Sequence, residues 1–291
     1  MNNFNEILFR LPDEIRDEIS LLPKEMISKV EEIRLRSGQY PNILYGNHEK
    51  DLSTKVTKDH LRTTLNALIK YSYYAYEEDL AKGFVTIKGG HRVGICGKAI
   101  VNKDVPTLIK EVSSLNIRFA KEIKGCANIL IPIIIKESKP VNTLIVSPPG
   151  CGKTTLLRDI ARILSTRNIK VAICDERSEI AGMCEGSPSY DLGPRTDVID
   201  GCDKRYGIPI LIRSMSPQVI ITDEIGKESD IETIEQCTHS GVNIITSIHG
   251  TNLDDLLLAK IGPLIDKKTF TNIVFLSAED GPGTIKEIRC V

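Results

Sequence analysis

A glycine-rich segment near the middle of the chain restricts the possible folds more than any other feature. Ser147–Thr154 reads SPPGCGKT and lies between an apolar run, Thr143–Val146, and a helical pattern over Thr154–Ser165. Gly150 and Gly152 allow the backbone to turn so that successive N–H groups point at one anion. The following helix directs the positive end of its dipole at the same point. The segment therefore predicts an α/β fold that binds phosphate at the end of a strand.

The residue types in this segment also predict the ligand. The segment follows the P-loop pattern G-x-x-x-x-G-K-[ST], except that Ser147 occupies the position of the first glycine. Lys153 can reach the β and γ phosphates, and the hydroxyl of Thr154 can bind magnesium. We therefore predict that the chain binds ATP and Mg²⁺ and hydrolyses ATP. The predicted nucleotide-binding residues are Ser147, Pro148, Pro149, Gly150, Cys151, Gly152, Lys153, Thr154 and Thr155.

Further apolar runs of strand length follow the loop. They are Ile169–Cys174, Val219–Thr222 and Val242–Ser247. Because these runs do not alternate with polar residues, they predict strands buried on both faces of a parallel sheet. Asn272–Leu276 and Thr284–Cys290 flank a turn sequence and predict a closing hairpin. Strands that alternate with helices predict ligands at the carboxyl ends of the strands.

Two helices of this region carry specific predictions. On the helix after the glycine-rich loop, apolar residues share one face, and we expect Arg158, Asp159 and Arg162 on the opposite face. Ser229 and Glu232 have the spacing of a capping box that opens a second helix.

The first part of the chain has a different character. Lys58–Lys82 has apolar residues at helical spacing, and Phe84–Ile87 and Arg92–Ile95 resemble short strands joined through two glycines. A polar segment ending in proline then precedes the first apolar run of the second part. The predicted organisation is a smaller α+β N-terminal domain (1–135), a linker (136–140) and a nucleotide-binding domain with a mainly parallel sheet (141–291).

Two acidic motifs are candidates for the catalytic chemistry. One apolar run ends in Asp223 and Glu224, which is a Walker B arrangement. Asp223 would hold magnesium through its water shell, and Glu224 could orient or polarise the attacking water. A second acidic cluster, Asp175–Glu179, follows a strand that we expect beside the P-loop strand. Glu176 and Glu224 therefore compete for the catalytic role.

His249 follows a third apolar run, Ile244–Ile248. A polar residue at this place can report whether the γ phosphate is present, because it loses a hydrogen bond when the phosphate leaves. A lone histidine is more often structural, so its position at the end of a core strand is the main argument for function.

Together these motifs resemble the Walker A, Asp box, Walker B and His box of the secretion ATPases of type II and type IV secretion and of type IV pili. More closely, five stretches resemble the stage III sporulation protein AA family of endospore-forming bacteria. They are Glu32–Arg36, Gly89–Gly94, Leu115–Arg118, Asp175–Gly182 and Ile221–Gly226.

The resemblance implies a RecA-like ATPase domain, a hexameric ring and a role in a secretion-like channel between mother cell and forespore. By analogy, Glu176 of the Asp box would be the catalytic glutamate. Secretion ATPases often have Gly-Glu in Walker B, whereas this chain has Asp223-Glu224, so Glu224 stays a candidate. Ring ATPases complete their sites with arginines, and Arg195 and Arg205 are the first candidates here.

Composition limits the alternatives. Lys plus Arg (38) nearly equals Asp plus Glu (39), and aromatic residues make up only 5%. This balance disfavours stable nucleic-acid binding and a nucleic-acid translocase. A nucleotide-gated scaffold with little turnover stays an alternative to a motor.

The sequence also predicts the compartment and the partners. Met1–Arg10 lacks the pattern of a signal peptide, and the longest apolar stretch, Ile129–Ile135, is too short to span a bilayer. We expect a cytoplasmic protein that meets the membrane through membrane-embedded channel proteins. We also expect the eight scattered cysteines to be reduced and structural.

Overall fold

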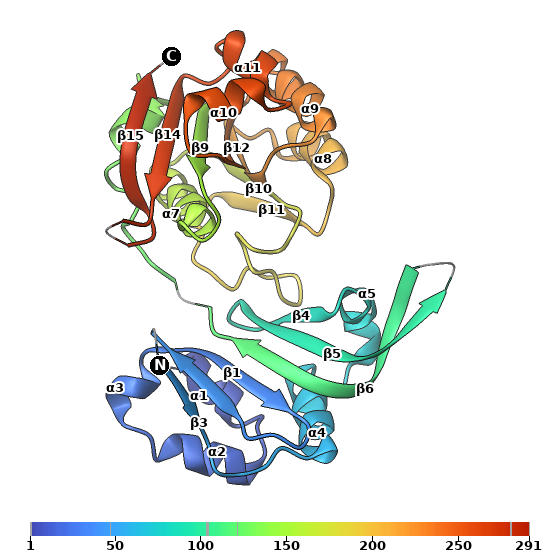
Figure 1. Cartoon of the computed structure of the whole chain (residues 1–291). Coiled ribbons are helices and arrows are strands. Elements are labelled where there is room, and N and C mark those ends of the chain that lie inside the picture. Colours follow the sequence, from blue (N-terminus) through green and yellow to red (C-terminus); the bar gives the residue numbers. More distant parts are fainter. Residues whose placement is uncertain (1, 47, 103–104, 121, 280, 291) are drawn as a thin grey trace. The chain divides into compact units, whose positions relative to one another are not determined.

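The computed structural model describes residues 2–46, 48–102, 105–120, 122–279 and 281–290. They form two compact units, the first made of Met1–Lys121 with Cys184–Ser189 and the second of Glu122–Met183 with Tyr190–Val291 (Figure 1). This division differs from the predicted linker at 136–140. Ala127, Leu130 and Ile131 are buried in the core of the second unit, so the chain enters that unit earlier than its polar segment suggests. Within 136–140, β7 (Ile135–Lys136) pairs with β8 (Lys139–Pro140).

The first unit is built on a six-stranded antiparallel sheet with the order β3-β2-β1-β6-β5-β4. Its strands are β1 (Val30–Arg36), β2 (Asn42–Tyr45), β3 (His48–Asp51), β4 (Phe84–Ile87), β5 (His91–Asn102) and β6 (Val105–Arg118). Its helices are α1 (Asn2–Leu8), α2 (Asp13–Ser20), α3 (Lys24–Ile27), α4 (Lys58–Leu68), the 3₁₀ helix η1 (Tyr73–Tyr76) and α5 (Glu77–Ala81). Ile33 and Leu35 on the sheet pack with Ile15 and Leu61 from the helices in one hydrophobic core.

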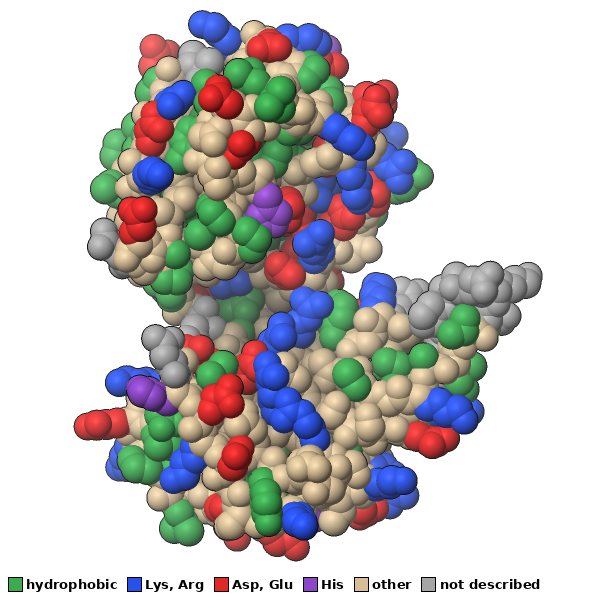
Figure 2. Space-filling model, viewed as in Figure 1, with side chains coloured by type: hydrophobic (Ala, Val, Ile, Leu, Met, Phe, Trp, Pro, Cys, Tyr) green, Lys and Arg blue, Asp and Glu red, His purple; other side chains and the backbone are tan. Residues whose placement is uncertain are grey.

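The opposite face of this sheet carries basic side chains. Arg34 and Arg36 alternate with the buried residues of β1, and Arg92 pairs with Arg118 across β5 and β6. Figure 2 shows basic side chains gathered in a line on the first unit. Glu32 partly neutralises them, because its carboxylate forms ion pairs with Arg34 (2.8 Å) and Arg118 (3.2 Å).

The predicted helix over Lys58–Lys82 is wrong as one continuous element. α4 ends at Leu68, Lys70 and Tyr71 adopt left-handed backbone angles (φ 51° and 58°), and η1 and α5 follow. The N–H of Tyr71 donates to the carbonyl of Asn66 (2.8 Å), which closes the helix end. Apolar spacing does not reveal such a break. The predicted strand Phe84–Ile87 is confirmed, and Arg92–Ile95 is part of the longer β5.

The second unit contains a seven-stranded sheet with the order β11-β10-β12-β13-β9-β14-β15. Its strands are β9 (Thr143–Ser147), β10 (Val171–Asp175), β11 (Thr196–Asp200), β12 (Val219–Glu224), β13 (Asn243–His249), β14 (Asn272–Ser277) and β15 (Thr284–Cys290). All neighbours are parallel except β14 and β15, which pair antiparallel. The predicted parallel sheet and closing hairpin are therefore confirmed.

Helices cover both faces of this sheet, as expected for strands buried on two sides. α7 (Lys153–Thr166) and the short α6 (Ile131–Ile134) pack on one face. The other face is covered by α8 (Lys204–Met215), α9 (Glu228–His239), α10 (Leu253–Leu258) and α11 (Gly262–Asp266). The unit thus has three layers (Figure 1).

We expected β10 to lie beside the P-loop strand β9, and this prediction is wrong. β13 and β12 lie between them. As a result, the strands that converge with the P-loop end in His249 and Glu224, whereas the end of β10 lies on the far side of β12.

Two of the charged residues that we expected opposite the apolar face of α7 are buried. Arg158 is only 7% exposed and Asp159 only 3%. Both charges are buried because they have partners: Arg158 donates to the carbonyl of Ile180 (2.7 Å), and Asp159 accepts from the N–H of Ala127 (2.9 Å) and from Arg162.

α9 is capped differently from the prediction. It begins at Glu228, so Ser229 and Glu232 already lie inside the helix. The carboxylate of Asp230 accepts from the backbone N–H groups of Gly226 and Lys227 (2.8 Å each). Asp230 therefore performs the capping that we assigned to the Ser229–Glu232 pair.

All eight cysteines are free thiols. Burial raises the pKa of both Cys174 and Cys237 to about 12, which keeps these thiols protonated. In the described part of the chain, no helix is both long enough and apolar enough to cross a membrane.

Gly193 lies in the loop before β11, close to Ser165 of α7. Its substitution tests how tightly this loop packs on that helix. Gly193 has φ +82°, and a Cβ there would lie 2.6 Å from Cβ of Ser165. We predict that Gly193→Ala destabilises the protein by about 2–4 kcal/mol, from backbone strain and steric overlap. Gly201 (φ +67°) has open space around it, so Gly201→Ala should cost only about 1–2 kcal/mol. Urea unfolding measures both, and equal costs would contradict the proposed packing.

Candidate functional site

The P-loop connects the end of β9 to the start of α7. Gly150 (φ +77°) and Gly152 (φ +83°) both adopt the left-handed conformation that glycine permits. A Cβ on Gly152 would lie 3.2 Å from the backbone N of Gly283, and the N–H of Gly283 donates to the carbonyl of Cys151 (2.9 Å). The turn between β14 and β15 therefore supports the loop from behind.

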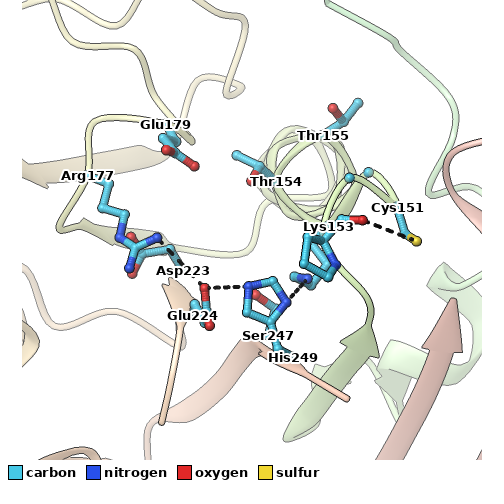
Figure 3. Close-up of a pocket in the computed structure, with 13 residues that line it drawn as sticks. Cys151, Lys153, Thr154, Thr155, Arg177, Glu179, Asp223, Glu224, Ser247 and His249 are labelled. Atoms are coloured by element: carbon cyan, nitrogen blue, oxygen red, sulfur yellow. Dashed lines mark hydrogen bonds and ion pairs between the residues drawn. The ribbon is translucent and has the colours of Figure 1, made fainter. Parts of the chain in front are cut away.

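A cavity of about 370 Å³ lies against this loop (Figure 3). It is lined by Pro149–Thr155 together with residues from the ends of β12 and β13 and from the loop after β10. The latter residues are Arg177, Glu179, Asp223, Glu224, Ser247 and His249. Of the nine predicted nucleotide-binding residues, seven line the cavity, whereas Ser147 and Pro148 do not.

Lys153 bends back onto its own loop. Its Nζ donates to the carbonyls of Ser147 (3.0 Å) and Pro148 (3.2 Å) and contacts Nδ1 of His249 (2.9 Å). Because an ammonium can only donate, Nδ1 of His249 accepts, and Nε2 carries the proton of the neutral ring. Burial lowers the pKa of Lys153, and the carboxylate of Glu224 opposes this shift.

The protonated Nε2 of His249 lies 3.1 Å from Oε2 of Glu224, and Arg177 lies 3.8 Å from the same oxygen. Arg177, Glu224, His249 and Lys153 thus form a continuous series of polar contacts along the cavity (Figure 3). The register of the sheet creates this series, since His249 pairs with Ser147 and Glu224 pairs with Ser247. The contacts link Lys153 of the glycine-rich loop to Glu224 at the end of β12.

Asp223 has the properties of a ligand for magnesium. It is 7% exposed, and its Oδ1 forms an ion pair with Lys204 (2.7 Å). Its Oδ2 is buried and has no hydrogen-bond partner among the described residues. An acceptor oxygen left in this state is costly unless a donor reaches it. Water bound to magnesium is such a donor, and Thr154 lines the same cavity.

No group of three or more His, Cys, Asp or Glu side chains could hold a metal ion in the described ranges. Magnesium in nucleotide sites usually has one or two protein ligands, with phosphates and water completing its shell. The pair of Thr154 and Asp223 fits that requirement.

Glu176 does not line the cavity. Its carboxylate binds Lys204 (2.7 Å) and Lys227 (2.8 Å). Burial alone would raise the pKa of Glu176, but these two ammonium groups outweigh it and lower the pKa. Glu179, three residues later, lines the cavity instead, and its carboxylate faces the side where Thr154 lies (Figure 3).

The predicted arginines lie outside the cavity of their own chain. Arg195 is exposed and precedes β11, at the amino ends of the strands. Arg205 is exposed near the start of α8 and pairs with Asp203 (3.1 Å).

Sequence reasoning missed Arg177 and Lys204. Lys204 is 4% exposed, and it bridges Asp223 and Glu176. Burial alone would lower the pKa of Lys204, but the two carboxylates raise it, so the side chain is a cation. No sequence signal marks it, because it simply follows the helix-capping residue Asp203.

A family model and a relative that matches nearly the whole chain identify the same family. The family model described as "Sporulation stage III, protein AA" matches residues 2–290. The chain is 39% identical over 290 residues to the stage III sporulation protein AA of Bacillus subtilis (strain 168), covering 98% of this chain and 94% of that protein. It is 33% identical over 149 residues to the uncharacterized protein ycf45 of Cyanidium caldarium, covering 50% of this chain and 43% of that protein.

Solved structures of an ATPase and of a pilus retraction motor share the fold. The structure of the ATPase DotB of Legionella pneumophila gives a TM-score of 0.57 at 15% identity, covering 84% of this chain and 72% of that one. The pilus retraction motor PilT with bound ADP gives 0.61 at 14% identity, covering 87% and 76%. At this level of identity, the likeness establishes the RecA-like fold that the sequence predicted.

Substitution of Lys204 tests whether its ammonium neutralises the buried carboxylate of Asp223. Lys204→Met leaves Asp223 without its buried cation, so we predict a loss of about 3–5 kcal/mol in stability. Lys227 also pairs with Glu176, but its side chain is 59% exposed. Lys227→Met should therefore cost less than about 1 kcal/mol. Equilibrium urea unfolding compares the two variants, and similar small losses would show that Lys204 does not neutralise Asp223.

Proposed function

Because this chain belongs to the sporulation stage III protein AA family, we propose that it is an ATPase that binds ATP and Mg²⁺ in the P-loop cavity. The observation that carries this proposal is the convergence of three features in one cavity. They are the glycine loop with Lys153, the hydroxyl of Thr154, and the buried Oδ2 of Asp223, which accepts no hydrogen bond from the described residues.

Nucleotide binding would change the partners of Lys153. Its ammonium would leave the loop carbonyls for phosphate oxygens, while the N–H groups of the loop and the start of α7 hold the same phosphates. Thr154 and Asp223 would hold magnesium, which neutralises charge that develops on the phosphates. His249 would lose the hydrogen bond from Lys153 and change its contact with Glu224. We therefore assign His249 and Glu224 to the response to the γ phosphate.

For the hydrolytic step, we assign Glu179 as the residue that activates water. The oxygen of water would form a bond to the γ phosphorus as the bond to the β-phosphate oxygen breaks, and Glu179 would take the proton of that water. Glu179 lines the cavity, whereas Glu176 is engaged by two lysines outside it. Glu224 contacts His249 and Arg177, and this position in the series that leads to Lys153 suits a linking role.

The wider role of the protein is part of the same proposal. The described fold resembles motors of secretion and pilus systems, and the family is a sporulation family. We propose a hexameric ring that drives a secretion-like channel between mother cell and forespore, at the cytoplasmic side of the membrane, through membrane-embedded partners. Arg195 and Arg205 lie outside their own cavity, so they would act only in the site of a neighbouring subunit.

The carboxylates can be separated by substitution. We predict that Glu179→Gln lowers kcat by about 10²- to 10⁴-fold, because the neutral amide cannot accept the proton, while ATP affinity is retained. Glu176→Gln is the matched control from the same loop and should keep kcat within about tenfold. Steady-state hydrolysis and fluorescent-nucleotide binding measure both quantities. A Glu179→Gln variant with normal kcat would contradict the assignment, and a larger loss in Glu224→Gln would transfer the role to that residue.

Lys153→Ala tests nucleotide binding itself. Loss of the charge-assisted contacts to phosphate should weaken ATP binding by about 100-fold. In the natural protein, turnover per subunit should rise with protein concentration if neighbouring subunits complete the site. ATP binding without turnover at any concentration would favour a nucleotide-gated scaffold over a motor.

A further inference from the structure

The loop that carries Glu179 into the cavity is fixed by a buried carboxylate. Asp175, fully buried at the end of β10, accepts three backbone hydrogen bonds. Its donors are the N–H groups of Glu179 (2.9 Å), Ile180 (3.0 Å) and Ala181 (2.8 Å). We expected Asp175, in the Asp box, to follow a strand beside the P-loop strand. The structure shows it instead below the loop, where it orients three successive amides.

A buried arginine holds the carbonyl groups of the same residues. Arg158, which is 7% exposed, donates from Nε to the carbonyl of Ile180 and from Nη2 to the carbonyl of Glu179, both at 2.7 Å. The backbone of Glu179 and Ile180 is therefore bound on its N–H side by Asp175 and on its C=O side by Arg158. Hydrogen bonds to charged groups are stronger than neutral ones.

Arg158 also contacts Tyr190, the residue at which the chain re-enters the second unit. Between Met183 and Tyr190, residues Cys184–Ser189 belong to the first unit. The guanidinium carbon of Arg158 lies 3.5 Å from the ring centre of Tyr190, which is a close cation–π contact. The side chain of Arg158 thus contacts Glu179 and Ile180 before the Cys184–Ser189 segment and Tyr190 directly after it.

The position of Arg158 on α7 gives this clamp a functional consequence. α7 begins at Lys153, and Arg158 follows Thr154 by one helical turn. The same rigid helix therefore carries the phosphate and magnesium ligands at its start and the loop clamp one turn later. Glu179 itself is exposed, and its flexible side chain needs a fixed backbone to reach one place in the cavity.

We propose that Arg158 is a positioning residue that fixes the Glu179 carboxylate relative to the P-loop by holding the backbone of Glu179 and Ile180 and the ring of Tyr190. This inference rests on the proposed role of Glu179 as the residue that activates water. It assigns Arg158 no contact with nucleotide.

The first test separates kcat from nucleotide affinity. Arg158→Lys keeps the charge but loses the two parallel hydrogen bonds, and we expect kcat to fall about 10- to 100-fold while ATP affinity stays within threefold. Arg162→Gln is the matched control, because Arg162 lies one turn later on α7 and pairs with Asp159 rather than with the loop. It should leave kcat within about threefold. Parallel losses of kcat and ATP affinity in Arg158→Lys would overturn the proposal.

A double-variant comparison tests whether Arg158 acts through Glu179. In a Glu179→Gln background, adding Arg158→Lys should lower the residual kcat by less than about twofold, since there is no carboxylate left to position. If the two losses multiply, Arg158 acts by another route and the inference fails. If Glu179→Gln keeps full activity, the assignment of Glu179 as the water-activating residue is wrong. The hold of Arg158 on the backbone of Glu179 and Ile180 then needs a separate test.

Hydrogen–deuterium exchange without nucleotide tests whether Arg158 holds this backbone, and it needs no turnover. Arg158→Gln should speed exchange of the amides of residues 179–181 at least about tenfold, because their segment loses its buried support. Arg162→Gln and Glu179→Gln should leave this exchange unchanged. Unchanged exchange in Arg158→Gln, with the variant folded by circular dichroism, would show that Arg158 does not hold the loop.

Discussion

The cavity at the glycine-rich loop depends on the place of β13 between β9, which leads into that loop, and β12. Parallel pairing brings the carboxyl ends of these three strands to one edge of the sheet. Apolar side chains on both faces of β9 and β13 fix this register, because a shift of one residue would exchange the faces that the helices cover. The contacts between Lys153, His249 and Glu224 follow from that register.

Around this edge, buried charges replace apolar packing. Lys204 joins Asp223 to Glu176, and Arg158 with Asp175 holds the loop between β10 and β11. Buried ion pairs contribute little net stability compared with apolar residues of the same size. Their value here is positional, since each fixes the direction of a carboxylate or of a backbone segment. One group of charges orients Asp223, and the other orients the loop that carries Glu179.

Much of this arrangement could be predicted from sequence, because strand–loop–helix patterns and a phosphate loop report local structure. The parallel sheet, the closing hairpin and the RecA-like fold were predicted correctly. The order of the strands was not, since apolar runs do not reveal which strands are neighbours. That error placed the Asp175–Glu179 cluster beside the P-loop and made Glu176 a candidate. The buried state of Arg158 and the role of Lys204 were missed for a related reason: the partners of a buried charge are distant in sequence.

The proposed function requires that Asp223 and Thr154 meet a magnesium ion bound to ATP at the P-loop. The most direct test is a crystal structure of the protein with Mg²⁺ and a non-hydrolysable ATP analogue. We expect phosphates against the amides of Gly150–Thr155, the metal bound to the hydroxyl of Thr154, and metal-bound water donating to Oδ2 of Asp223. A metal ion bound away from both residues, or phosphates outside the loop, would contradict it.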